Sequence, residues 1–150
     1  MPEKGIIAII GAGSCDENIS RIAERMGKLI AEAGFVLVCG GLGGVMEAAA
    51  KGAKKAGGLT IGILPGFDKQ DTNPHIDIPI ITGLSHARNV IVVRSSDIVV
   101  AITGEYGTLS EIALALKMEK VVIGIDTWDI EGVIKVKTPE EAMEKIKELL

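Results

Sequence analysis

The chain has 150 residues, of which 47% are hydrophobic but only 3% aromatic. Its core must therefore consist of Val, Ile, Leu, Ala and Met, a composition that suits a parallel sheet covered by helices on both faces. The net charge of −4 gives no general attraction for nucleic acid. No apolar run approaches the ~20 residues that span a membrane. We therefore expect one domain over residues 1–150 that has neither a membrane nor a nucleic acid as partner.

The start of the chain and its cysteines bear on the compartment. Met1-Pro2-Glu3-Lys4 leads directly into a strand-length apolar run, not into the hydrophobic segment of a signal peptide. Two cysteines, Cys15 and Cys39, are too few for a disulfide framework or a zinc cluster. Two histidines without nearby acids make a poor metal site. These features favour a cytoplasmic protein with free thiols and no bound metal.

Short runs rich in Ile and Val alternate with amphipathic runs along the whole chain. Strands are predicted at 5–10, 35–39, 59–64, 98–102, 121–125 and, as a short one, 133–136. Helices are predicted at 18–33, 45–56, 84–95, 109–118 and 140–150, the last with a capping box that begins at Thr138. Residues 67–82, which include two prolines, are expected to be an irregular excursion. This alternation predicts an α/β fold, a single-domain Rossmann-like three-layer sandwich with a mostly parallel sheet.

Three of the predicted strand-to-helix turns are rich in glycine. The residues concerned are Gly11, Gly13 and Ser14; Gly40, Gly41, Gly43 and Gly44; and Gly104, Tyr106, Gly107 and Thr108. Such turns let backbone N–H groups approach an anion, and the helix behind each turn adds a partial positive charge. Any one of these turns could be glycine-rich only because a tight turn needs it. Three at the carboxyl edge of one sheet predict a phosphate-binding site.

The sequence argues against two common nucleotide motifs. The first turn places Asp16 where the dinucleotide fingerprint has its third glycine, and the second strand ends in Cys39 instead of an acidic residue for a ribose. The chain contains no Gly-Lys-Ser or Gly-Lys-Thr, so it has no Walker P-loop. These two observations make a dinucleotide or a nucleoside triphosphate a poor match for the site.

Three segments resemble a known family. Residues 39–46, CGGLGGVM, resemble the GGGxxGLM loop of the Lonely Guy (LOG) proteins, and residues 104–111, GEYGTLSE, resemble their PGGxGTxxE motif. Residues 86–89, HARN, align with their MHxRK element. The variant looks more like a sister subgroup that contains the molybdenum cofactor carrier proteins of algae. LOG proteins cleave the N-glycosidic bond of nucleoside 5′-monophosphates, whereas the carriers bind a pterin phosphate without converting it.

The resemblance assigns roles to individual residues. It implies that the turn at 104–108 holds a 5′-phosphate, that Glu111 faces the sugar and stabilises an oxocarbenium-like transition state, and that Arg88 supplies positive charge. Glu111 and Arg88 would then be the catalytic residues. Departures from the LOG pattern are Thr103, Glu105 and Asn89, which replace a proline, a glycine and a lysine. Both Glu105 and Asn89 make the site less positive.

Alternatives remain open at this stage. Glu111 could be a surface charge, and Arg88 a solvated residue or an ion pair with Asp97 or Glu111. Three functions remain. The first is a carrier of a nucleotide or of a pterin phosphate such as molybdenum cofactor, which needs no further cofactor, and the second is a phosphoribohydrolase. The third is a DNA-binding relative, which the acidic net charge disfavours. Because helix 84–95 is apolar on more than one face, we also expect a homodimer or homotetramer.

Overall fold

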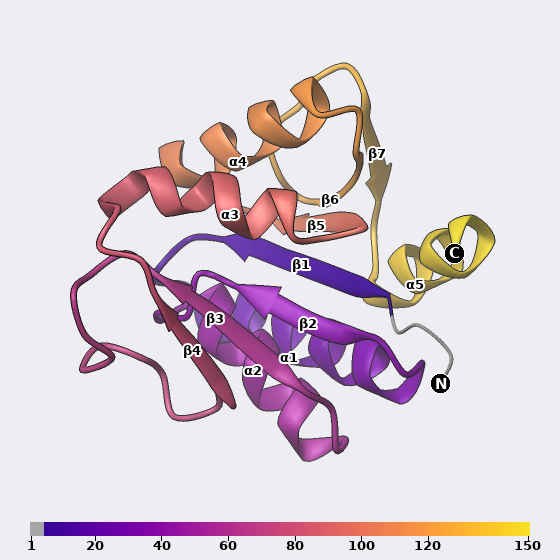
Figure 1. Cartoon of the computed structure of the whole chain (residues 1–150). Coiled ribbons are helices and arrows are strands. Elements are labelled where there is room, and N and C mark those ends of the chain that lie inside the picture. Colours follow the sequence, from indigo (N-terminus) through magenta and orange to yellow (C-terminus); the bar gives the residue numbers. More distant parts are fainter. Residues whose placement is uncertain (1–4) are drawn as a thin grey trace.

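The computed structural model describes residues 5–150, so the expectation about Met1–Lys4 lies outside the described residues. Seven strands form one sheet in the order β4-β3-β2-β1-β5-β6-β7, and every neighbouring pair is parallel (Figure 1). The strands are β1 (Ile6–Gly11), β2 (Val36–Cys39), β3 (Thr60–Leu64), β4 (Ile78–Ile81), β5 (Ile98–Ile102), β6 (Val121–Ile125) and β7 (Val133–Val136). The predicted α/β fold is confirmed, and the sheet is wholly parallel.

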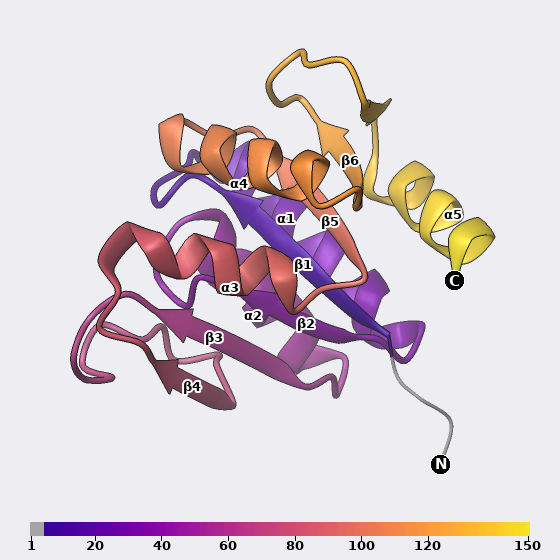
Figure 2. The ribbon, with the colours of Figure 1, turned by 45° about the horizontal axis from the view of Figure 1, so that its top comes forward.

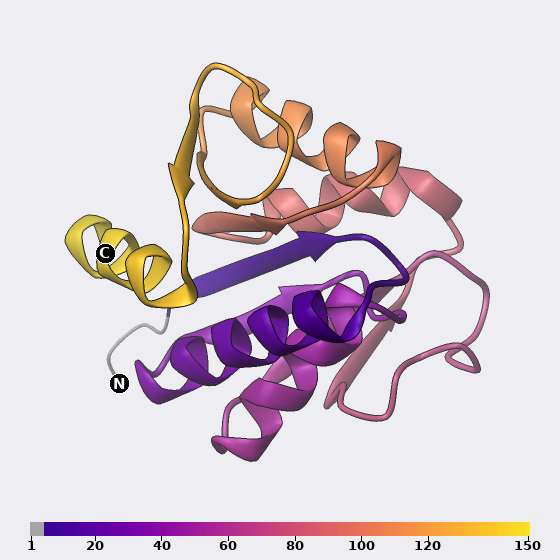
Figure 3. The same cartoon turned by 180° about the vertical axis from the view of Figure 1, so that it is seen from behind.

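Helices cover both faces of the sheet. They are α1 (Glu17–Glu32), α2 (Val45–Lys55), the 3₁₀ turn η1 (Ser85–Arg88), α3 (Asn89–Arg94), α4 (Tyr106–Lys117) and α5 (Pro139–Leu149). The first face packs against α1, α2 and α5, which Figure 3 shows from behind. The opposite face packs against α3 and α4, which lie in front of the sheet in Figure 2. Within residues 5–150, no helix has both the length and the apolar content that crossing a membrane requires.

Local signals in the sequence explain where the outer helices begin. The Asp16 carboxylate accepts a hydrogen bond of 2.8 Å from the Ile19 N–H and caps α1. At α5, the Thr138 hydroxyl accepts from the Glu141 N–H at 3.1 Å, and Pro139 occupies the first helical position. The predicted capping signal is therefore confirmed at α5.

Three elements differ from the prediction in ways that matter for the site. The single helix predicted at 84–95 is the 3₁₀ turn η1 followed by the short helix α3, and Arg88 and Asn89 lie where the two meet. The segment predicted as irregular at 67–82 contains β4, an edge strand, and an edge tolerates Pro79 because one side of the strand needs no partner. The Thr60 N–H donates to the Asp77 carboxylate at 3.0 Å, which fastens the start of β4 to β3. Moreover, α4 begins at Tyr106 instead of residue 109, so Gly107 and Thr108 belong to its first turn.

Candidate ligand-binding pocket

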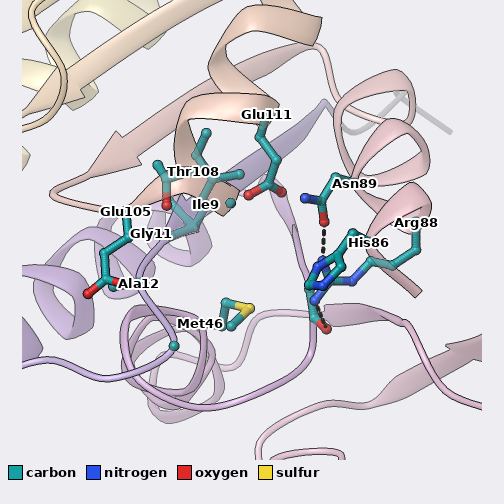
Figure 4. Close-up of a pocket in the computed structure, with 14 residues that line it drawn as sticks. Ile9, Gly11, Ala12, Met46, His86, Arg88, Asn89, Glu105, Thr108 and Glu111 are labelled. Carbon is teal, nitrogen blue, oxygen red and sulfur yellow. Dashed lines mark hydrogen bonds between the residues drawn. The ribbon is translucent and has the colours of Figure 1, made fainter. Parts of the chain in front are cut away.

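A cavity of about 210 Å³ opens at the carboxyl edge of the sheet (Figure 4). It lies between the end of β1, the start of α2, the η1–α3 segment and the first two turns of α4. Its lining residues are Ile9, Ile10, Gly11, Ala12, Gly13, Gly40, Met46, His86, Arg88, Asn89, Glu105, Gly107, Thr108 and Glu111. This is the edge at which ligands bind in open parallel sheets.

Glu111 points into this cavity from the second turn of α4 (Figure 4). The residue is only 7% exposed, so it is not the surface charge considered above. Burial raises the pKa of the Glu111 carboxyl to about 7, while the nearby positive charge of Arg88 acts to lower it. Within residues 5–150 none of the ion pairs includes this carboxylate, and its oxygens are accessible from the cavity, because no fully buried side-chain oxygen in this range lacks a hydrogen-bond partner. The carboxylate faces the space that a ligand would fill.

Arg88 is buried and held by backbone carbonyls. Its Nε donates to the Ile63 carbonyl at 2.8 Å and its Nη2 to the Gly40 carbonyl at 3.5 Å, while Nη1 donates to the Asn89 side chain. At 8% exposure it is not a solvated residue, and within the described range it forms no ion pair with any carboxylate. Asp97 instead accepts the Ile6 N–H at 2.8 Å. Neither structural alternative for Arg88 is therefore correct.

Asn89 connects the two sides of the cavity. Its Oδ1 accepts from Arg88, and its Nδ2 donates to the Ser110 hydroxyl at 3.2 Å. Ser110 in turn donates to the Gly107 carbonyl at 2.6 Å. In the sequence, Asn89 stood out only as a departure from the LOG pattern. Its position directly after Arg88 was the one feature that could have indicated that its side chain bonds to Arg88. Nothing in the sequence singled out the apolar wall residues Ile9, Ile10 and Met46 as part of the site.

Five of the predicted phosphate-binding residues line the cavity, namely Gly11, Gly13, Gly40, Gly107 and Thr108. The others, Ser14, Gly41, Gly43, Gly44, Gly104 and Tyr106, do not. For Gly44 and Gly104 the backbone geometry gives a steric reason: both have positive φ, and an added Cβ would lie 2.3 Å from the Ala12 carbonyl oxygen and 2.4 Å from the Thr108 side chain. Tyr106 is 81% exposed and stacks on Trp128 with ring centroids 6.0 Å apart.

A second cavity of about 480 Å³ adjoins the first, and the two share Gly13. Ser14 and Gly44 line this second cavity, together with Lys51. The first turns of α2 and α4 supply donors nearby, because neither helix has a side-chain cap at its N-terminus. Backbone N–H groups at such helix starts are suited to an anion. Within residues 5–150, no three His, Cys, Asp or Glu side chains gather into a possible metal site.

A family model described as the SLOG cluster4 family matches residues 4–149. The chain belongs to the SLOG cluster4 family. An uncharacterized protein of Archaeoglobus fulgidus is 56% identical over 138 residues, which cover 91% of each chain. The molybdenum cofactor binding protein of Rippkaea orientalis is 43% identical, with a TM-score of 0.94 over 98% of each chain. The molybdenum cofactor carrier protein of Chlamydomonas reinhardtii is 40% identical, with a TM-score of 0.90 over 97% of this chain and 98% of that one.

Proposed function

We propose that this protein binds molybdenum cofactor, a pterin phosphate, in the cavity beside Glu111 and carries it without converting it. One observation carries the proposal: the two similar structures named above, a cofactor binding protein and a cofactor carrier protein, are at least 40% identical over nearly the whole chain. The matches cover 97–98% of this chain at TM-scores of 0.94 and 0.90.

The cavity supports this proposal through its chemistry. Ile9, Ile10 and Met46 offer apolar surface to a flat ring, and the buried groups of Arg88 and Glu111 offer polar contacts at one end. Ligand pockets usually measure roughly 300–1,000 Å³. The first cavity, at about 210 Å³, therefore encloses only part of such a ligand, and the remainder would extend past Gly13 towards the second cavity.

The proposal is tested by the ligand that the protein carries when purified. The chain is produced in a host that makes molybdenum cofactor and in one that cannot, and the pterin released by denaturation is identified by mass spectrometry. Gly13→Leu is the blocking variant, because a side chain there meets no protein atom within 4 Å and would fill the ligand space. Gly66→Leu is its matched control, because Gly66 is equally open but lines neither cavity.

We expect cofactor on the wild-type protein and on Gly66→Leu from the producing host, and at least tenfold less on Gly13→Leu. No pterin on the wild-type protein, or equal amounts on Gly13→Leu, would contradict the proposal.

A phosphoribohydrolase is the second candidate, and the observation in its favour is the Glu111 carboxylate, which faces the cavity without a protein partner. Against it, Glu105 and Asn89 remove positive character, and Arg88 directs N–H groups to Gly40 and Ile63. Released adenine from AMP tests this candidate. If the protein is a phosphoribohydrolase, Glu111→Gln should lower the turnover of AMP at least a hundredfold and change the affinity for AMP only a fewfold. The reason is that Glu111 would stabilise a positive charge on the sugar that exists only while the N-glycosidic bond breaks. The DNA-binding alternative has no observation in its favour.

We also propose a homodimer or homotetramer. In segment 84–95, Val92 and Val93 are buried against the chain's own sheet, whereas Leu84 and Val90 remain 49% and 37% exposed, so part of the apolar surface that suggested assembly stays uncovered. Further exposed apolar side chains lie on and beside the edge strand β4, where Ile80 is 43% and Phe67 is 90% exposed. Exposed apolar strand edges favour association. Light scattering at micromolar concentration should show a mass of two or four chains, and a monomer would contradict this.

A further inference from the structure

We propose that the Glu111 carboxylate recognises the pyrimidine edge of the pterin by accepting two parallel hydrogen bonds, one from the ring N3–H and one from the 2-amino group. This inference rests on the proposed function, because it assumes that the ligand is a pterin. It assigns to Glu111 the selection of one ring class and not a step of bond cleavage.

The first argument is that the Glu111 carboxylate has no hydrogen-bond donor from the protein within residues 5–150. Glu111 is 7% exposed and its side chain points into the cavity (Figure 4). Buried carboxylates in proteins are paired or hydrogen-bonded, because losing water without a replacement is costly. Within residues 5–150 no protein hydrogen bond to these two oxygens is found, and the oxygens are accessible from the cavity. Arg88, the nearest strong donor set, directs N–H groups to Ile63, Gly40 and Asn89. The donors must then come from what fills the cavity.

The second argument concerns which edge of a ligand ring can supply the hydrogen-bond donors to Glu111. A carboxylate is matched by two N–H groups that point the same way, as in its pairing with the guanidinium fork. A 2-amino-4-oxopyrimidine ring, the head of a pterin, presents such a pair in its N3–H and 2-amino group. The corresponding edge of adenine presents one donor and one acceptor and fits only the protonated carboxyl. An ionised Glu111 therefore favours the pterin ring over adenine.

The charges around Glu111 are consistent with this arrangement. Arg88 from η1 and Cys39 from β2 interact with it electrostatically, and His86 and Glu105 line the same cavity. Burial disfavours the charge on Glu111, and the positive charge of Arg88 favours it. An edge with two donors stabilises the ionised form further. The ligand phosphate carries the same sign as Glu111 and therefore lies away from that carboxylate, at the end of the cavity near Gly13. The adjoining cavity contains Lys51, but Asp16, Glu17 and Glu47 also line it, so the charges there do not by themselves attract the phosphate.

The test compares two ligands that differ at one position. The probes are 6-hydroxymethylpterin phosphate and 6-hydroxymethyllumazine phosphate, in which a 2-oxo group replaces the 2-amino group. Fluorescence titration at pH 7.5 gives both affinities for the wild-type protein and for Glu111→Gln. The amide of Gln can accept from the ring N3–H and donate to the 2-oxo group. We expect the wild-type protein to prefer the pterin at least tenfold, and Glu111→Gln to prefer the lumazine.

Two further variants keep the result interpretable. Glu144→Gln removes an exposed carboxylate of α5 and should leave the preference unchanged. Glu111→Asp keeps the charge but shortens the side chain, and it should weaken binding of the pterin while preserving the preference. If Glu111→Gln binds the pterin as tightly as the wild-type protein, or weakens both ligands equally, the inference is overturned while pterin binding stands. If the wild-type protein binds neither probe, the inference and the proposed function both fail.

Discussion

The two helical layers of this protein differ in what they bury. Against α1, α2 and α5 the sheet forms a large apolar cluster that includes Met26, Ile30 and Met143. Against α3 and α4 the apolar cluster is smaller, and buried polar residues gather beside it around the cavity, among them Arg88, Asn89 and Glu111. The difference indicates that the layer of α1, α2 and α5 chiefly stabilises the fold. The layer of α3 and α4 instead contains the Glu111 carboxylate, whose ionised form is disfavoured by burial.

The contact between α1 and α2 shows how tightly the first layer is packed. Gly27 lies against the backbone of α2, and an added Cβ would sit 1.9 Å from the Ala49 carbonyl oxygen. Gly52 faces the backbone of α1 in the same way, 1.9 Å from the Glu24 carbonyl oxygen. The helices can approach this closely only because glycine has no side chain at these two positions. No such constraint acts at Gly107 beside the cavity, where an added Cβ meets nothing within 4 Å.

The largest effect is expected from breaking the first layer with Gly27→Ala. The new methyl group would overlap backbone, which cannot move without separating the two helices, so the free energy of unfolding should fall by about 3 kcal/mol or more. Chemical denaturation measures this loss. Lys28→Ala, at the exposed neighbouring position, is the control and should change stability by less than about 0.5 kcal/mol. A loss below about 1 kcal/mol for Gly27→Ala would show that the close contact between α1 and α2 does not determine the stability of the protein.

The second prediction concerns the pH dependence caused by Glu111. Because the folded pKa of about 7 lies above the ordinary value of 4.5, the folded protein holds this proton more tightly than the unfolded chain does. The wild-type protein should then lose stability as the pH rises from about 4.5 to 7 and stay at the lower level above that. The loss is at most roughly 3.5 kcal/mol, because one pKa unit corresponds to about 1.4 kcal/mol.

Glu111→Gln removes this titration while nearly preserving size. Its melting temperature should exceed that of the wild-type protein by several degrees at pH 8 and equal it near pH 4.5. Glu144→Gln, at an exposed position on α5, should show no such trend. Parallel melting curves for the wild-type protein and Glu111→Gln across this range would mean that burial does not penalise the Glu111 charge.

Much of this comparison could be predicted from the sequence, and the reasons are local. Strands β5 and β6 were predicted to the residue, because each short run of Val and Ile begins after a charged residue, Asp97 or Lys120, and ends before a polar one, Thr103 or Asp126. The start of α4 was misplaced by three residues, since Gly107 reads as part of a turn although it lies in the first turn of the helix. β4 was missed because Pro79 disfavours a strand unless the strand is known to lie at an edge.

Contacts between distant residues were beyond such reasoning. The pairing of Arg88 with the carbonyls of Ile63 and Gly40 joins segments 25 and 48 residues apart, and backbone carbonyls leave no signature in the sequence. The buried state of Glu111 likewise depends on how α4 packs against the end of β1. The resemblance to a known family did lead to both residues, but only the packing shows that Arg88 is held by the backbone and that Glu111 is not.

The third prediction tests Arg88, which links the cavity to the sheet. Arg88→Ala leaves the Ile63 carbonyl without its side-chain donor and removes a buried positive charge, so stability should fall by about 2 kcal/mol. Affinity for a pterin phosphate should also weaken, by about 1.5–3 kcal/mol, if the remaining N–H groups contact the ligand. Denaturation and titration measure the two effects separately, and Arg94→Ala at the exposed end of α3 is the control. A loss of stability with unchanged affinity would assign Arg88 a purely structural role.

The smallest effect, and the clearest contrast between the two layers, is expected from Gly107→Ala. Gly107 lies in the first turn of α4 with room for a methyl group, so alanine should stabilise the protein by about 0.5–1 kcal/mol through its lower conformational freedom when unfolded. Gly52→Ala, the same exchange in the other layer, should destabilise it, because there the Cβ meets the Glu24 backbone. Chemical denaturation of both variants measures the opposite signs. Since Gly107 also lines the cavity, its variant should bind a pterin phosphate more weakly despite being more stable. Equal losses of stability at Gly52 and Gly107 would mean that the α4 side is packed as tightly as the α1–α2 contact.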